Sequence, residues 1–187
     1  SSVIDGLMKR ISQRGRMVKM RHLKPRTALL QRGDAGVTVV DPHGKPPRSA
    51  LLSLAKIFVW LLEEWRAHLF QDKKGELLIC DRYYHDLLID PRRYRYGGSM
   101  IAARLVGKLM PPPDLWVFLD APALVLQARK QEVPIEETER QRHAYLEFVK
   151  SQKDYRIVDA SQALSQVIAD AEAAITGVMK GVDGKRG

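Results

Sequence analysis

The chain has 187 residues, of which 45% are apolar and 28% charged. This length is enough for one domain with a hydrophobic core and too short for two domains of ordinary size. The apolar content excludes an intrinsically disordered chain, and the single cysteine, Cys80, excludes a disulfide scaffold and indicates a reducing, cytoplasmic setting. No stretch reaches the roughly 20 apolar residues of a membrane span, so we expect a soluble protein with no membrane partner.

The formal net charge of +9 is concentrated in two blocks. Eight basic residues lie between Asp5 and Asp34 with no acidic residue among them: Lys9, Arg10, Arg14, Arg16, Lys19, Arg21, Lys24 and Arg26. A second block between Asp90 and Asp114 holds Arg92, Arg93, Arg95, Arg104 and Lys108. Such blocks favour a polyanionic partner, either a nucleic acid, an anionic membrane surface or nucleotide phosphates, although the first block is equally consistent with a solvated face.

Short apolar runs alternate with segments of helical periodicity along the chain. The predicted strands are Met17–Leu23, Leu77–Asp81, Leu115–Asp120 and Arg156–Asp159. The predicted helices are Ser2–Arg14, Ala50–Phe70, Ser99–Met110, Ala123–Arg129 and Ile135–Lys150, with a last helix that begins at Ser161 as its N-cap and stops at Gly177 or Gly181. Ala50–Phe70 is apolar on most sides, which is typical of a central or interface helix.

This alternation predicts an α/β fold, a doubly wound parallel sheet with helices on both faces. The nearly continuous apolar runs Leu77–Cys80 and Leu115–Leu119 are typical of strands covered on both faces. We expect a single domain over residues 1–179 and a flexible tail over 180–187. Ligands of such sheets bind at the carboxyl ends of the strands, so the strand-end groups are expected to converge there: Asp81-Arg82, Asp120 and Asp159-Ala160-Ser161.

Asp81 and Arg82 are the first candidates for chemistry at those strand ends. In a phosphoryl-transfer site such an Asp can hold Mg²⁺ and such an Arg can clamp a phosphate, although an Asp-Arg pair can also only cap a loop. The segment Pro91–Gly98, with Arg95 and Tyr96, could stack a base and bind its phosphate. In the alternative interpretation it is a basic surface loop whose tyrosines pack on the neighbouring helix.

Two further segments have alternative interpretations. We interpret the charged stretch over residues 129–142 as a closing lid, mainly because of its place after the third strand, with an ordinary solvated helix start as the alternative. Ser1 and Ser2 are suitable helix N-caps. Alternatively, Ser1 is the last residue of a phosphate loop, Gly-x-x-x-x-Gly-Lys-[Ser/Thr], whose earlier part and preceding strand are absent from this sequence. The histidines lack metal-ligand spacing, which argues against zinc.

With these motifs assembled, the chain resembles the thymidylate kinase-like branch of the P-loop nucleotide kinases over nearly its whole length. Five motifs in the right order carry the resemblance: Ser1-Ser2-Val3-Ile4, Asp81-Arg82-Tyr83, the stretch from Pro113-Asp114-Leu115 to Leu119-Asp120-Ala121-Pro122, Arg142-x-x-Tyr145, and Asp159-Ala160-Ser161-Gln162. The resemblance implies a kinase that uses ATP and Mg²⁺ and acts on a nucleotide or a similar small acceptor. Because related kinases are commonly dimers, it also implies a homodimer.

The same resemblance implies roles for individual residues. Ser1, with Ser2 beside it, would contact the nucleotide phosphates, and Ser1 would ligate Mg²⁺ through its hydroxyl. Asp81 would hold Mg²⁺ through water, and Arg82 would position the acceptor phosphate. The remaining assignments are Arg129 and Lys130 for the transferring phosphoryl group, Ala160, Ser161 and Gln162 for the border of the adenine, and Tyr83, Arg95 and Tyr96 for the acceptor.

The leading hypothesis is therefore phosphoryl transfer from ATP to a nucleotide-like acceptor. A second hypothesis is a non-catalytic nucleotide-binding or regulatory module of kinase ancestry, because the glycine-rich loop and its lysine are not in this sequence and the lid carries Glu132, Glu136 and Glu137. A third is nucleic-acid binding through the two basic blocks, which predicts a steep loss of affinity as salt rises.

Overall fold

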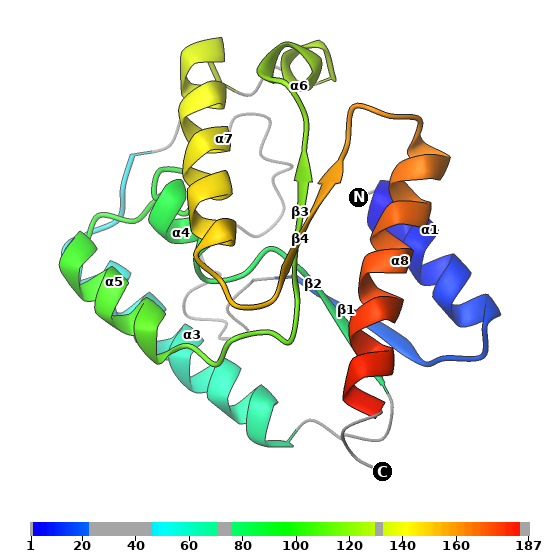
Figure 1. Cartoon of the computed structure of the whole chain (residues 1–187). Coiled ribbons are helices and arrows are strands. Elements are labelled where there is room, and N and C mark those ends of the chain that lie inside the picture. Colours follow the sequence, from blue (N-terminus) through cyan, green and yellow to red (C-terminus); the bar gives the residue numbers. More distant parts are fainter. Residues whose placement is uncertain (1, 23–45, 71–75, 130–132, 184–187) are drawn as a thin grey trace. The chain divides into compact units, whose positions relative to one another are not determined.

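A computed structural model describes residues 2–22, 46–70, 76–129 and 133–183 of the chain (Figure 1). Their elements are, in order, α1 (Ser2–Gln13), β1 (Val18–His22), α3 (Ala50–Phe70), β2 (Leu77–Asp81), α4 (Asp86–Ile89), α5 (Met100–Leu109), β3 (Trp116–Asp120), α6 (Ala123–Arg129), α7 (Ile135–Lys150), β4 (Tyr155–Asp159) and α8 (Leu164–Asp183). The chain divides into two compact units, unit 1 (Ser1–Lys19, Gly75–Ile79 and Pro113–Gly187) and unit 2 (Met20–Lys74 and Cys80–Pro112).

Most predicted elements are present within about one residue of their expected ends. Three predictions at the C-terminal side are wrong in detail: α8 begins at Leu164 rather than at Ser161, it passes through both glycines expected to stop it, and it extends to Asp183 into the segment expected to be a tail. The short helix α4 was not predicted, because four residues are too few to show a helical period. The single domain over 1–179 stays a prediction.

In unit 1, β3 and β4 are parallel neighbours, with Trp116 opposite Tyr155 and Asp120 opposite Asp159. Alternate residues of β3 pack on opposite sides, as the two-residue period of a strand requires. The Trp116 ring lies edge-on to Phe148 of α7, with 5.0 Å between centroids. On the other side, Val117 and Leu119 join a cluster with Val158 of β4 and Val167 of α8. Figure 1 shows α7 and α8 on either side of this strand pair. β3 is thus covered on both faces, as its apolar run predicts.

Helices α1 and α8 pack against each other beside β2. Leu7 and Ile11 of α1 and Ala171 of α8 form a buried cluster that also takes in Leu77 and Ile79 of β2. At Gly6 a Cβ atom would lie only 2.3 Å from Cδ1 of Ile168, so this glycine allows the close approach of the two helices.

Unit 2 has its own core, formed by α3, α5 and the segment that follows β2. Ile57 and Trp60 of α3 and Tyr84 are almost completely buried, and Ala103 of α5 joins them. The Trp60 ring meets the Tyr84 ring edge-on with 6.2 Å between centroids. The Tyr84 hydroxyl donates to the Ala103 carbonyl at 2.9 Å, so the buried phenol is satisfied.

The described strands form two two-stranded sheets, β1 with β2 and β3 with β4. Helices and strands alternate along the chain, so the mixed α/β class is confirmed, while the doubly wound sheet stays a prediction. Within residues 2–183, apart from the ranges not described, no helix combines the length and apolar content needed to cross a bilayer.

Candidate functional site

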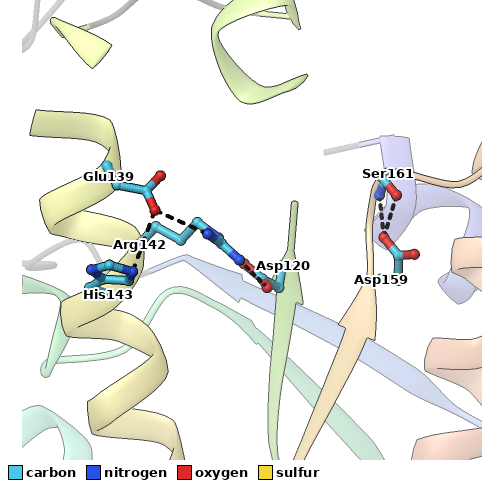
Figure 2. Close-up of polar contacts among 6 residues, drawn as sticks. All are labelled: Asp120, Glu139, Arg142, His143, Asp159 and Ser161. Carbon is cyan, nitrogen blue, oxygen red and sulfur yellow. Dashed lines mark hydrogen bonds and ion pairs between the residues drawn. The ribbon is translucent and has the colours of Figure 1, made fainter. Parts of the chain in front are cut away.

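The carboxyl ends of β3 and β4 bring two carboxylates to one end of the strand pair. Asp120 and Asp159 are the last residues of their strands and are partners in the parallel register. The backbone continues the pairing, since the Ala160 N–H donates to the Asp120 carbonyl at 2.6 Å. Figure 2 shows the two side chains at the strand ends, each with a different partner.

Asp120 is held by Arg142 of α7. The guanidinium donates two hydrogen bonds to it, from Nε to Oδ1 at 2.7 Å and from Nη2 to Oδ2 at 2.9 Å. Arg142 Nη1 also donates to Oε1 of Glu139 at 3.2 Å, and Nε2 of His143 lies 3.4 Å from the same oxygen. The hydrogen bonds with Asp120 are the main reason that the pKa of the Arg142 guanidinium lies above its usual value. The bidentate geometry fixes both partners and ties α7 to the end of β3.

Asp159 closes a tight turn with Ser161. Its Oδ1 accepts the Ser161 backbone N–H at 2.8 Å and the Ser161 hydroxyl at 2.5 Å. These two hydrogen bonds lower the pKa of the Asp159 carboxyl, and the bond from the Ser161 hydroxyl has the larger effect. Ser161 does not cap α8, because the helix begins three residues later, at Leu164. Ser161 and Gln162 are exposed, whereas Ala160 is buried.

Two residues that the sequence assigns to the nucleotide, Arg129 and Ala160, meet here. Arg129 at the end of α6 donates from Nη1 to the Ala160 carbonyl at 2.8 Å. Its predicted companion Lys130 lies outside the described residues. The described part of the predicted lid is mostly helix α7. The side-chain amide of Gln127 in α6 contacts the start of this helix, because it donates to the Val133 carbonyl at 2.7 Å and to the Thr138 hydroxyl at 2.7 Å. The lid itself stays a prediction.

The start of α1 lies at the same end of the strand pair. Ser2 begins the helix, and Val3 packs against the cluster that contains Ala121 and Ala160, the residues that follow β3 and β4. Ser1 lies outside the described residues. The helix start therefore adjoins both strand ends, which is where a nucleotide-binding α/β protein presents backbone N–H groups to phosphates.

Asp81, the last residue of β2, and Arg82, which follows it, belong to unit 2. Arg82 has a φ of 74°, a left-handed backbone that a side chain rarely adopts and that persists only where neighbours fix it. Its Nη1 donates to Oδ2 of Asp86 at 2.7 Å, and the Tyr94 hydroxyl donates to the same oxygen at 2.5 Å. Asp86 is buried while the Arg82 side chain is 39% exposed. The carboxylate thus anchors a guanidinium that reaches solvent.

The residues assigned to the acceptor lie mostly in structural contacts. The Tyr83 hydroxyl donates to the Pro111 carbonyl at 2.5 Å, and burial raises the pKa of this phenol well above its usual range. Tyr96 is only 7% exposed, and its hydroxyl donates to the Ser99 carbonyl at 3.0 Å. Arg95 donates from Nε to the Pro46 carbonyl at 3.1 Å. This packing favours the alternative interpretation, in which the tyrosines of this loop pack inward.

Sequence reasoning missed Asp86, and it named Asp120 and Arg142 without pairing them. Asp86 had one usable signal, a carboxylate four residues after an arginine, although that spacing matters only if a helix begins there. No group of three His, Cys, Asp or Glu side chains arranged to hold a metal occurs among the described residues. This finding does not test the predicted Mg²⁺ site, because Mg²⁺ uses only one or two carboxylates when phosphates supply its other ligands. No protein-family model matches the chain.

Proposed function

We propose that the protein transfers a phosphoryl group from ATP to a small nucleotide-like acceptor in a reaction that requires Mg²⁺. One observation carries the proposal: Asp120, the Asp159–Ser161 turn, the Arg129–Ala160 contact and the start of α1 gather at the carboxyl ends of β3 and β4. In α/β folds that end of the strands is where nucleotides bind.

The proposed roles follow from the contacts. The exposed side of the Ala160–Gln162 turn would border the adenine, and Arg129, already positioned by the Ala160 carbonyl, would offset charge on the phosphates. Arg82, anchored by Asp86, would bind the acceptor phosphate. Asp81 would contribute a carboxylate to Mg²⁺, which supplies charge neutralisation on the phosphates when bound. A cytoplasmic location and a homodimer also belong to this proposal.

The direct test is ADP release from the protein as its gene encodes it, with ATP, Mg²⁺ and a panel of nucleoside monophosphates. We expect turnover with at least one acceptor, and a loss of about 100-fold or more in kcat/KM for Arg129→Ala. The matched control is Arg140→Ala, which removes another exposed arginine, one bonded to Glu137 within α7. ATP binding without turnover of any acceptor would contradict the proposal.

The second candidate is a nucleotide-binding module without catalysis. It is favoured by the engagement of Asp120, whose two carboxylate oxygens accept hydrogen bonds from Arg142. The same assay separates the two candidates, because the module binds ATP with no ADP release above the uncatalysed rate.

Nucleic-acid binding is the least supported candidate. Several cations of the first basic block form ion pairs within the chain: Arg10 and Arg14 with Glu172, Lys19 with Glu76, and Arg21 with Glu64. Cations paired in this way contribute less to a polyanion site. Binding of RNA or DNA that weakens steeply with salt would restore this candidate.

A further inference from the structure

Helices α1 and α8 form a small polar cavity in unit 1, next to the buried cluster through which they pack. Its volume is about 240 Å³, and it is lined by Arg10, Gln13 and Arg14 at the end of α1 and by Glu172 of α8. We name it the α1–α8 cavity. A helix rises about 1.5 Å per residue, so Arg10 lies about 12 Å along α1 from Ser2, where this helix adjoins the candidate nucleotide site. The cavity is therefore separate from that site.

The α1–α8 cavity is built around a buried carboxylate. The Glu172 side chain is 7% exposed, whereas Arg10 is 40% and Arg14 65% exposed. Nη1 of Arg10 lies 3.7 Å from Oε2 of Glu172, and Nε of Arg14 lies 3.0 Å from Oε1. Since a buried carboxylate must be compensated by cations, Glu172 holds both guanidiniums at the cavity. Each guanidinium has five N–H donors, so most of these donors remain for a ligand.

The four lining side chains favour a small oxyanion. Two guanidiniums against one carboxylate leave an excess of one positive charge. The guanidiniums and the Gln13 amide offer N–H donors, and guanidiniums bind phosphate and carboxylate oxygens with particular strength. Pockets for drug-sized ligands measure about 300–1,000 Å³. The α1–α8 cavity is smaller, so it takes a single charged group rather than a whole nucleotide.

Glu172 adds a hydrogen-bond acceptor to a site that otherwise offers donors. Its Oε1 is buried and accepts no hydrogen bond from the residues that the structure describes, although Arg14 lies within ion-pair distance. A buried acceptor without a donor is costly, so a ligand that brings an O–H group is favoured here. A protonated phosphate group has such an O–H beside its anionic oxygens. Sulfate and phosphodiesters have only acceptors, which the carboxylate repels.

We infer that the α1–α8 cavity binds a protonated phosphate group, either as inorganic phosphate or as the end of a phosphate monoester. Arg10, Gln13 and Arg14 donate hydrogen bonds to its anionic oxygens, and Glu172 accepts the hydrogen bond of its O–H. The backbone of a nucleic acid consists of phosphodiesters, so this site does not select it. The inference does not depend on the proposed kinase activity.

The test is an NMR titration of the whole isotopically labelled protein at about pH 6, where phosphate groups still carry a proton. Inorganic phosphate should shift the side-chain N–H signals of Arg10 and Arg14 saturably, with a dissociation constant on the order of 1 mM. Sulfate should bind about tenfold more weakly or worse, because it cannot satisfy Glu172. A site that recognises charge alone would bind sulfate at least as tightly, since sulfate is the more highly charged ion at this pH.

Two methyl esters identify the form of phosphate that the cavity accepts. Methyl phosphate keeps an ionisable O–H, so binding comparable to that of inorganic phosphate assigns the site to monoesters, and binding of inorganic phosphate alone assigns it to the free ion. Dimethyl phosphate has no O–H and should bind about tenfold more weakly than inorganic phosphate. Dimethyl phosphate that binds as tightly as inorganic phosphate would overturn the inference.

Variants separate recognition from packing. Arg14→Gln should weaken phosphate binding by about tenfold or more, because it removes a charged donor. The matched control is Arg16→Gln, which changes an arginine outside the lining that contacts Met179 and should leave binding unchanged. Glu172→Gln should abolish the preference for phosphate over sulfate, a result that a purely structural role of Glu172 does not produce.

Circular dichroism shows whether each variant keeps its helices. If Glu172→Gln fails to fold, the ratio of phosphate to sulfate affinity in the wild type still decides. Sulfate that binds as tightly as phosphate would overturn the inference. So would phosphate binding that leaves the Arg10 and Arg14 signals unmoved, or no binding at about 20 mM phosphate.

Discussion

Arg142 and Asp120 form a bidentate pair across 22 residues of sequence, with donor–acceptor distances of 2.7 and 2.9 Å, and this pair joins helix α7 to the end of strand β3. Both side chains are about four-fifths buried. The pair therefore fixes the position of one of the two strand-end carboxylates around which the candidate nucleotide site is built.

Replacing Arg142 by Ala should destabilise the protein. It leaves a partly buried carboxylate without its guanidinium, which costs about 1–3 kcal/mol in the free energy of unfolding. Urea denaturation measures this loss. Arg140→Ala, which breaks a more exposed pair with Glu137, should cost about 0.5 kcal/mol or less. Equal losses for the two variants would show that the Asp120 pair is no stronger than a surface ion pair.

Asp86 should be the more sensitive member of the network that anchors Arg82. Asp86→Asn leaves both Arg82 and the Tyr94 hydroxyl without the buried carboxylate, so we expect a loss of about 2–4 kcal/mol. Tyr94→Phe keeps the ring and removes one hydrogen bond, for a loss of about 1 kcal/mol. Asp114→Asn, an exposed carboxylate, is the control for urea denaturation. A variant of Asp86 as stable as the Asp114 variant would refute this ranking.

The Ser161 hydroxyl should control the titration of Asp159. Its hydrogen bond lowers the pKa of Asp159, so the folded state favours the ionised carboxyl. This contribution is present above the unfolded pKa of about 3.9 and is lost as pH falls through the lower folded pKa. Ser161→Ala should therefore raise the titration midpoint of the Asp159 carboxyl carbon in ¹³C NMR. An unchanged midpoint would show that the Ser161 hydroxyl does not contribute to the lowered pKa of Asp159.

His85 should make the protein sensitive to mild acid. Burial is the main cause of its lowered pKa, and a hydrogen bond with the Gly107 backbone opposes the shift. As pH falls below about 6.5, the unfolded pKa of histidine, His85 takes up a proton in the unfolded chain but not yet in the folded one. The free energy of unfolding therefore decreases between this pH and the lower pKa of His85 in the folded state. His85→Gln should flatten the loss of stability between about pH 6.5 and 5. His143→Gln, in which the replaced histidine is 67% exposed, should leave it unchanged.

Local patterns in the sequence predict most elements of this fold, and they fail where a distant contact decides. The apolar run Leu115–Leu119 predicts a strand covered on both faces because each of its residues must find an apolar neighbour. The pairing of Asp120 with Arg142 has no local signal. Ser161 resembles a helix cap in sequence, but α8 begins three residues later, and the Ser161 N–H and hydroxyl both donate to Asp159 instead.

The segment Pro91–Gly98, which was predicted to bind the acceptor, is a second place where the sequence pattern does not decide the structure. Arginines and tyrosines that alternate along Pro91–Gly98 suggest a surface for bases and phosphates. The core of unit 2 takes up the Tyr96 ring, and the Tyr94 hydroxyl serves Asp86. Composition cannot separate these outcomes, because a tyrosine has the same apolar ring whether it stacks on a base or packs beneath a loop.

The most direct test of the central claim is to locate where ATP binds, by titrating the isotopically labelled protein with MgATP and following its amide and arginine side-chain NMR signals. The account predicts saturable shifts at Ala160, Ser161 and the Arg129 side chain, which Arg129→Ala weakens and Arg140→Ala does not. Saturable binding that leaves these three signals unmoved, or no binding at millimolar MgATP, would contradict it.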